Sequence, residues 1–304
     1  MFPIQTRRGF LSTLAVVFAA RKAFAFPSQI ASTKLTDNLT LITGAGGNIV
    51  VLSQPEGLLL VNGSSPEMAA DLMKHLSDQF KGQPVKAVFN TDWHLDHTGS
   101  NEMFKKAGAK ILAHENTKLW IGADFYSDWD KHTYKPRPAE ALPTDTFYTS
   151  GKMTFGKEPV EYGYMPQAHT DGDIYVFFPS QNVLVTGDVV TVGQYPVLDY
   201  VTGGWIGGMQ TALTDLLKVA KADTRVIPGT GPVLTRADIQ AESEMMNAMR
   251  ERLVNLMRQG MGPSDMIAAQ PSKEFDAKWG KPDVFIRNAY HGMWGHVREL
   301  GKIV

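Results

Sequence analysis

The loop Asp92-Trp93-His94-Leu95-Asp96-His97 places two imidazoles and two carboxylates within six residues. Imidazole nitrogens and carboxylate oxygens are donors that zinc, iron and manganese accept from proteins. The chain contains no cysteine, which excludes thiolate ligands, disulfides and a cysteine nucleophile. We therefore expect a metal centre built from nitrogen and oxygen donors alone.

Three later segments share one design, in which an apolar run that is typical of a strand leads to a polar residue. His169, Asp188 and Thr230 each stand directly after such a run. Strand ends let loops aim side chains into a shared cleft while the sheet fixes their positions. A divalent ion held there would lower the pKa of its water and polarise a carbonyl group. The pattern therefore favours a metal-dependent hydrolase.

These motifs resemble those of the metallo-β-lactamase superfamily, lactamase-like or glyoxalase II-like, whose loop reads H-x-H-x-D-H. The resemblance runs in order over about residues 36 to 235 and implies an α+β fold. That fold is a four-layer αβ/βα sandwich of two mixed β-sheets with outer helices, and its metals lie at the sheet edge. Besides the loop, the similar landmarks are His169-Thr170-Asp171-Gly172-Asp173, Thr186-Gly187-Asp188 and Pro228-Gly229-Thr230-Gly231-Pro232.

The resemblance also implies roles for the candidate ligands. His94 and His169 would bind a first metal, Asp96 and His97 a second, and Asp188 would bridge the two. Asp96 would be the catalytic residue that orients the attacking water or accepts its proton. The expected cofactor is Zn²⁺, one ion or two, with iron or manganese as alternatives. Metal-bound hydroxide would then attack the ester, thioester, lactone or amide carbonyl, β-lactams included, of a small-molecule substrate.

Two positions depart from the family pattern. The first histidine of the loop is replaced by Asp92, and the last histidine, in the far turn, by Thr230. Asp92 can still ligate through oxygen, whereas the neutral hydroxyl of Thr230 is a weak donor. Three interpretations stay open. The site is altered but active, or His132 or His291 fills the gap, or the protein is a catalytically decayed binding or accessory protein of the same fold.

Residues 1–25 are typical of a twin-arginine-type signal peptide. Arg7 and Arg8 precede a short apolar run, and Ala23-Phe24-Ala25 suits cleavage by signal peptidase. We therefore expect export to a bacterial periplasm, with no stable membrane insertion after cleavage. The whole chain has a net charge of −1. The four basic residues of the signal leave the rest at about −5, which argues against nucleic acid as a partner.

The elements that must position these residues can be read from the hydrophobic pattern of the 304-residue chain. Residues 26–304 should form one domain whose tail, about 236–304, is a helical extension. Residues 123–147 are rich in aromatics, proline and charge and predict a long loop that could cover the site. Its Tyr126, Trp129 and Tyr134 are candidates for lining a pocket or for packing, as are Tyr195, Tyr200 and Trp205. The predicted strands are 39–42, 48–52, 57–61, 85–89, 110–113, 153–155, 161–165, 174–178, 183–186 and 224–227, and the predicted helices are 66–80, 102–107, 210–220, 235–259 and a last one from 282.

Overall fold

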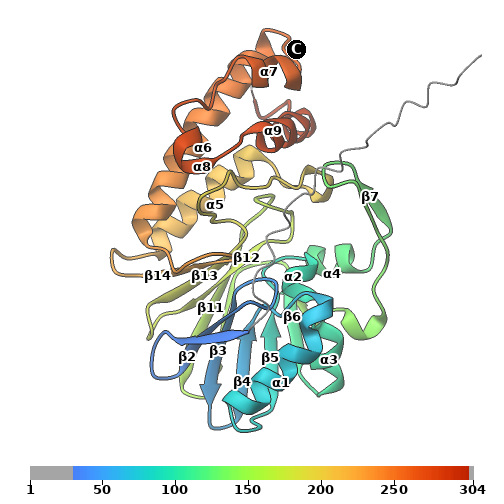
Figure 1. The fold of residues 1–304 in the computed structure, drawn as a ribbon, viewed down its shortest axis with the longest axis vertical. Coiled ribbons are helices and arrows are strands. Elements are labelled where there is room, and N and C mark those ends of the chain that lie inside the picture. The colour runs from blue at the N-terminus through green and yellow to red at the C-terminus, as the bar shows by residue number, and fades with distance from the viewer. Residues whose placement is uncertain (1–29, 301–304) are drawn as a thin grey trace, which may run out of the picture.

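Two β-sheets lie face to face in the computed structural model, and helices cover their outer faces (Figure 1). The structure describes residues 30–300, so the predicted signal peptide lies outside the described residues. In sequence order the chain builds the first sheet with its helices and then the second sheet with its own. This arrangement confirms the four-layer sandwich of mixed sheets.

In the described part of the chain, the first sheet has seven strands in the order β1-β2-β3-β4-β5-β6-β9. Neighbours from β1 to β4 pair antiparallel, and those from β4 to β9 pair parallel. The strands are β1 (Ala31–Lys34), β2 (Leu39–Thr43), β3 (Ile49–Gln54), β4 (Gly57–Val61), β5 (Val85–Phe89), β6 (Lys110–His114) and β9 (Asp145–Phe147).

The second sheet contains, within residues 30–300, five strands in the order β10-β11-β12-β13-β14. Only the β13–β14 pair in this sheet is parallel. The strands are β10 (Gly151–Phe155), β11 (Glu158–Tyr164), β12 (Ile174–Phe178), β13 (Val183–Gly187) and β14 (Arg225–Pro228). All the strands predicted from the sequence are therefore present in the two sheets.

The helices fall into two groups, one on each outer face. Helices from the first half of the chain cover the first sheet, and those from the second half cover the second sheet (Figure 1). The first group comprises η1 (Pro66–Met68), α1 (Ala69–Gln79), α2 (Leu95–Thr98), α3 (Asn101–Lys106), α4 (Glu115–Ile121) and η2 (Ala139–Ala141). The second comprises η3 (Tyr200–Thr202), α5 (Ile206–Val219), α6 (Arg236–Arg258), α7 (Pro263–Ala268), α8 (Asp276–Trp279) and α9 (Asp283–Gly295).

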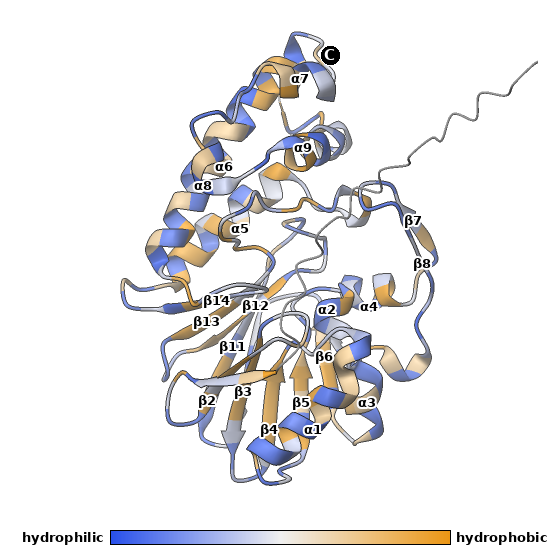
Figure 2. Ribbon diagram, viewed as in Figure 1, coloured by the Kyte–Doolittle hydropathy of each residue, from blue (hydrophilic) through white to orange (hydrophobic). Residues whose placement is uncertain are grey.

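The strands are hydrophobic on both faces because each sheet is covered on both sides. In β4, Leu59 and Val61 pack between the sheets, while the alternating Leu58 and Leu60 pack under α1 and α3. Figure 2 shows the strands as largely hydrophobic, whereas the outer helices carry many hydrophilic residues. On the far side, α5, α6 and α9 pack on the second sheet in one large core.

The segment 123–147 is more ordered than the predicted loop. It forms a hairpin of β7 (Phe125–Ser127) and β8 (His132–Tyr134), then η2 and β9. These strands have three residues each, too short for their hydrophobic pattern to be seen in the sequence. Within residues 30–300, no helix combines the length and the apolar character that crossing a bilayer requires.

Candidate metal centre

The predicted site residues meet at one edge of the sandwich, where strands of both sheets end. The loop that holds residues 92–97 follows β5 of the first sheet. His169 follows β11, and Asp188 directly follows β13, both in the second sheet. The centre is therefore assembled across the interface between the two sheets.

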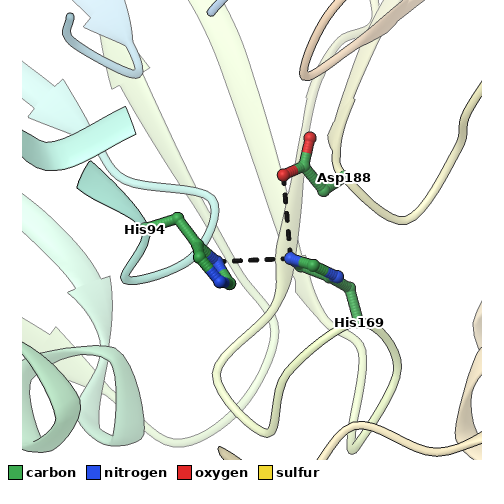
Figure 3. Close-up of side chains that lie close together, drawn as sticks. All are labelled: His94, His169 and Asp188. Carbon is green, nitrogen blue, oxygen red and sulfur yellow. Dashed lines mark hydrogen bonds and ion pairs between the residues drawn. The ribbon is translucent and has the colours of Figure 1, made fainter. Parts of the chain in front are cut away.

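One group that could hold an ion consists of His94, His169 and Asp188 (Figure 3). Nδ1 of His94 lies 3.2 Å from Nε2 of His169, and that Nε2 lies 3.6 Å from Oδ2 of Asp188. His169 is buried, and the other two side chains are partly exposed. Two imidazoles and one carboxylate thus converge on one point, which is a donor set suited to a divalent metal.

A second group joins Asp92 and His97 to the other oxygen of Asp188. Nε2 of His97 lies 3.8 Å from Oδ1 of Asp188 and 3.9 Å from Oδ2 of Asp96. Nδ1 of the same ring lies 2.6 Å from Oδ2 of Asp92. Asp188 therefore stands between the two groups, as the resemblance implies, and Asp96 lies at the outer border of the second.

The remaining candidate ligands do not join either group. Thr230 is exposed in the turn after β14. His132 is exposed on β8 and contacts Tyr134, while His291 is exposed on α9 and stacks on Tyr200. Among the described residues, neither histidine belongs to a His/Asp group that could hold an ion. The structure therefore leaves the position of the missing histidine unfilled by another imidazole.

Buried amides hold the loop that follows β5. Oδ1 of Asn62 accepts hydrogen bonds from the backbone N–H and the hydroxyl of Thr91, at 2.9 and 3.1 Å. Asn90 exchanges side-chain hydrogen bonds with Asn101 and donates to the carbonyl of His97. Sequence reasoning missed these three asparagines, although Asn62 and Asn90 directly follow predicted strands. They fix the backbone from which the candidate ligands project.

The ring of His169 is oriented by a backbone carbonyl. Its Nδ1 lies 2.8 Å from the carbonyl oxygen of Val197, which can only accept a hydrogen bond. The proton therefore resides on Nδ1, and the lone pair of Nε2 faces His94 and Asp188. This is the tautomer that metal ligation through Nε2 requires.

Asp199 is a further buried carboxylate that sequence reasoning missed. Its Oδ1 accepts a hydrogen bond from Nε1 of Trp129, and its Oδ2 accepts one from the hydroxyl of Thr202. Oδ2 also lies 3.7 Å from Nε2 of His94, on the side of the ring that faces away from His169. An aspartate before an aromatic residue in a loop gave no sequence signal, because its partners lie far along the chain.

The residues fit a bound cation on two observations. Nε2 of His97 is buried and has no hydrogen-bond partner, which is costly unless an ion or a bound molecule meets it. In addition, a Cβ atom added to Gly229 would lie 1.9 Å from Oδ1 of Asp188 and 3.0 Å from Nε2 of His97. Glycine at this position keeps open the space beside the candidate donors.

The electrostatics of the group also favour a cation. Burial by itself lowers the pKa of His94, but the hydrogen bond and charge of Asp92, with the charges of Asp199 and Asp96, raise it to about 9. Burial likewise opposes protonation of His97, and the nearby carboxylates outweigh it and raise its pKa. Burial raises the pKa of Asp188, while His97 and His169 counteract it. The carboxylates thus attract positive charge into the site.

The β7–β8 hairpin lies beside the loop of residues 92–97. Trp129 in its turn donates to Asp199, the hydroxyl of Tyr200 donates to Asp128, and the ring of Tyr134 meets Trp93 edge-on. Trp93 in turn stacks on His94 with ring centroids 4.1 Å apart. A cavity of about 80 Å³ under the hairpin is lined by Trp93, Leu95, Trp120, Ile121, His132, Tyr134, Lys135 and Arg137.

The predicted aromatic residues therefore separate into two sets. Trp129, Tyr134 and Tyr200 lie around the hairpin and the site. Tyr195 and Trp205 pack in the core under α5 and α9, and Tyr126 is largely exposed.

The family model described as the metallo-beta-lactamase superfamily matches residues 42–231, which is more than half of the chain and includes both groups of candidate ligands. The chain belongs to the metallo-beta-lactamase superfamily. Among curated relatives, a metallo-beta-lactamase type 2 of Bacillus sp. (strain 170) is 25% identical over 238 residues, covering 74% of this chain and 87% of that relative.

Solved structures of the superfamily share the fold. The metallo-beta-lactamase from Pontibacter korlensis has a TM-score of 0.59 at 21% identity, covering 72% of this chain and 99% of that one. The sec-alkylsulfatase Pisa1 from Pseudomonas sp. has a TM-score of 0.64 at 18% identity, covering 86% of this chain and 50% of that one. Members of the superfamily are metallo-hydrolases that bind divalent metal, typically zinc, so the hydrolase assignment holds at the level of the family.

Proposed function

We propose that this protein is a metal-dependent hydrolase that cleaves an ester, thioester, lactone or amide bond, β-lactams included, in a small molecule. The observation that carries the proposal is the convergence of His94, His169 and Asp188 at the edge of a metallo-hydrolase fold. Zn²⁺ is the proposed ion, with iron or manganese as alternatives that the same donors accept. When bound, such an ion supplies a water of lowered pKa and polarises the carbonyl group of the substrate.

The residues of the chain would bind, orient and move a proton around that ion. His94, His169 and Asp188 would hold the ion, and Val197 keeps Nε2 of His169 free to do so. Asp96 is the proposed catalytic residue. Its side chain is 36% exposed, so it borders both the buried donors and the solvent from which substrate arrives. From that position it can orient a water molecule and accept its proton.

The cavity of about 80 Å³ under the β7–β8 hairpin is the proposed seat of one group of the substrate. Trp93, which lines this cavity, stacks on His94, so one wall of the cavity contacts a candidate ligand. Its remaining walls include the aromatic rings of Trp120 and Tyr134, and Arg137 adds positive charge. These walls favour a substrate with a flat apolar group and a negative charge.

We also propose that the protein acts in the periplasm of a bacterium after export through its twin-arginine-type signal. The support is the pattern of residues 1–25 in the sequence. Fractionation of cells that produce the full chain tests the proposal, with Arg7→Lys/Arg8→Lys as the variant. We expect the native chain in the periplasmic fraction and the variant in the cytoplasm. A native chain that stays in the cytoplasm would contradict export.

Metal content and activity should be measured together on the purified protein. We expect a stoichiometric divalent metal and hydrolysis of at least one member of a panel of ester, thioester, lactone and lactam substrates. His169→Ala should lose both metal and activity. Asp96→Asn should keep tightly bound metal and lose at least about a hundredfold in kcat, because a proton acceptor typically contributes that much. A protein without metal, or an Asp96→Asn variant of full activity, refutes the proposal.

The second candidate function is a binding or accessory protein that has kept the fold without turnover. The observation that favours it is the exposed Thr230 where the family carries a metal-binding histidine. The variant Thr230→His separates the two candidates. If it creates metal affinity and activity that the native chain lacks, the native protein is the binding protein.

A further inference from the structure

Asp92 stands where the superfamily loop begins with a histidine, and its environment differs from that of a metal ligand. We propose that Asp92 is a positioning residue that holds His97, and that the chain binds one ion tightly, through His94, His169 and Asp188. This inference rests on the metal dependence proposed above. It also states how many ions bind tightly and which side chains hold them.

The carboxylate of Asp92 is already satisfied by protein donors. Its Oδ1 accepts the backbone N–H of His94 at 2.9 Å and also lies 3.2 Å from Nδ1 of the same residue. Its Oδ2 accepts Nδ1–H of His97 at 2.6 Å. The residue is 1% exposed. A buried carboxylate with these partners needs no cation to compensate its desolvation, because charge-assisted hydrogen bonds already do so.

The spacing of the donor atoms separates the two groups. Ligand atoms 2.0–2.1 Å from a tetrahedral ion lie about 3.3 Å from one another. Nδ1 of His94 and Nε2 of His169 are 3.2 Å apart, and Nε2 of His169 is 3.6 Å from Oδ2 of Asp188. These two separations and the three protein donors match an open zinc site. Oδ1 of Asp92 also lies 3.2 Å from Nδ1 of His94, but that oxygen already accepts the backbone N–H of His94.

The second group is looser and less complete. Nε2 of His97 is 3.8 Å from Asp188 and 3.9 Å from Asp96, and Thr230 supplies no imidazole from the far turn. The one short contact in this group is between Oδ2 of Asp92 and Nδ1 of His97. The other nitrogen of His97, Nε2, is buried and has no hydrogen-bond partner. Asp92 thus uses one nitrogen of His97 and turns the other toward Asp188 and Asp96. The arrangement orients His97, whose Nε2 is farther from Asp188 and Asp96 than the donor atoms of the first group are from one another.

Zn²⁺ alone is the probe for the first test, added to the metal-free full-length protein in a calorimetric titration. The variants are Asp92→Asn, His169→Ala and the control Asp276→Asn, a partly buried aspartate that accepts from Tyr195 under α8. We expect one tight equivalent in the native chain and in the control. Asp92→Asn should keep that equivalent with its affinity reduced by no more than about tenfold, the size of an indirect effect. His169→Ala should lose more than about a hundredfold, because it removes one of three donors.

A second readout concerns the ring of His97 and does not depend on activity. Imidazole ¹⁵N NMR of the Zn²⁺-loaded native protein should show a proton on Nδ1 of His97. An amide N–H in place of Oδ2 in Asp92→Asn would move that proton to Nε2. A proton that moves from Nδ1 to Nε2 of His97 is expected only if the carboxylate of Asp92 orients the ring. If the variant fails to fold, the position of the proton in the native spectrum alone tests the inference.

The outcomes separate this inference from the proposed function. A folded Asp92→Asn variant that loses the tight equivalent makes Asp92 a ligand and overturns the inference, while metal dependence stands. Two equally tight equivalents in the native chain, or a His97 without a proton on Nδ1, overturn it as well. A native chain that binds no Zn²⁺ overturns both the inference and the proposed function.

Discussion

At the scale of single residues, Asp199 is a buried carboxylate with only neutral hydrogen-bond donors and His94 around it. Trp129 and Thr202 donate to its oxygens, and Nε2 of His94 lies 3.7 Å from Oδ2. An ion held through Nδ1 of His94 would leave the ring proton on Nε2, the atom that lies 3.7 Å from Oδ2 of Asp199. Asp199 would then support the ligand through its charge, as carboxylates behind metal-binding histidines do.

We predict that Asp199→Asn weakens Zn²⁺ binding by about 10- to 100-fold, the usual cost of losing such a partner. The amide keeps the size of the side chain but loses the charge that makes Nε2–H of His94 favourable. Calorimetric titration of the folded variant measures the change, with Asp171→Asn as the control. An unchanged affinity would show that Asp199 serves only the hairpin.

Gly229 matters because of the space that it leaves. A Cβ at this position would lie 1.9 Å from Oδ1 of Asp188. We predict that Gly229→Ala displaces Asp188 and lowers Zn²⁺ affinity by at least about tenfold, since small shifts of a ligand are costly. Gly295→Ala is the control, because a Cβ there meets no atom within 4 Å. Equal affinities of the two variants, measured by titration, would contradict the prediction.

At the scale of elements, α6 reaches the site through one buried carboxyl group. Glu242 on α6 accepts the backbone N–H of Thr191 at 2.9 Å and its hydroxyl at 3.0 Å. Thr191 belongs to the loop that starts at Asp188 and ends at Asp199. The helical extension is therefore tied to the segment that carries two of the site carboxylates.

The same group should make stability depend on pH. Burial raises the pKa of Glu242 to about 8, against the opposing effects of Thr191 and Lys278, from an ordinary value of 4.5. Between these values the unfolded chain has lost a proton that the folded chain keeps. The contribution of Glu242 to stability is therefore full below pH 4.5 and falls as pH rises to about 8, by up to about 1.4 kcal/mol per pH unit.

We predict that Glu242→Gln removes this part of the pH dependence. Glutamine keeps an acceptor for the N–H of Thr191, offers an amide N–H to the hydroxyl oxygen of Thr191, and does not ionise. Urea unfolding at several values between pH 5 and pH 8 should show a smaller loss of stability for the variant than for the native chain. Parallel curves for the two proteins would rule out the raised pKa.

The β7–β8 hairpin is the element that was least visible in the sequence. Its contacts with the site run through Trp129 to Asp199 and through Tyr134 to Trp93. Its strands are three residues long, so side-chain contacts rather than the two-stranded ladder hold it in place. The hairpin consequently forms one wall of the proposed substrate cavity.

At the scale of the whole molecule, the candidate metal centre joins the two halves of the sandwich. His94 projects from the loop after a strand of the first sheet, and His169 and Asp188 follow strands of the second. An ion held by all three side chains would therefore connect the sheets at their edge, in addition to the hydrophobic core between them.

We predict that metal removal lowers the melting temperature reversibly. An ion present at a hundred times its dissociation constant stabilises the folded state by about 2.7 kcal/mol, which corresponds to roughly 5–10 °C for a chain of this size. Thermal unfolding followed by circular dichroism, with chelator and then with Zn²⁺ restored, measures the shift. His169→Ala should melt at the same temperature with and without metal. If the chelator leaves the melting temperature of the native protein unchanged, the ion does not link the two sheets.

The sequence by itself determined ten of the strands and the long helices, and it singled out the residues that converge at the candidate metal centre. Runs such as Leu58 to Val61 are hydrophobic on both faces because the sandwich buries both, and that pattern is local. The loop from Asp92 to His97 and the residues His169 and Asp188 stand directly after such runs, so their convergence at one edge could be foreseen.

Only the tertiary structure decided which atoms face one another. Asp92 is paired with His97, Asp199 with His94, and Glu242 with Thr191. The last two pairs join residues far apart in the sequence, and their approach depends on how the sheets and helices pack. Local hydrophobic periodicity carries no information about such partners. Asp92 therefore looked like a substitute ligand in the sequence, and its hydrogen bonds in the folded chain assign it to orienting His97.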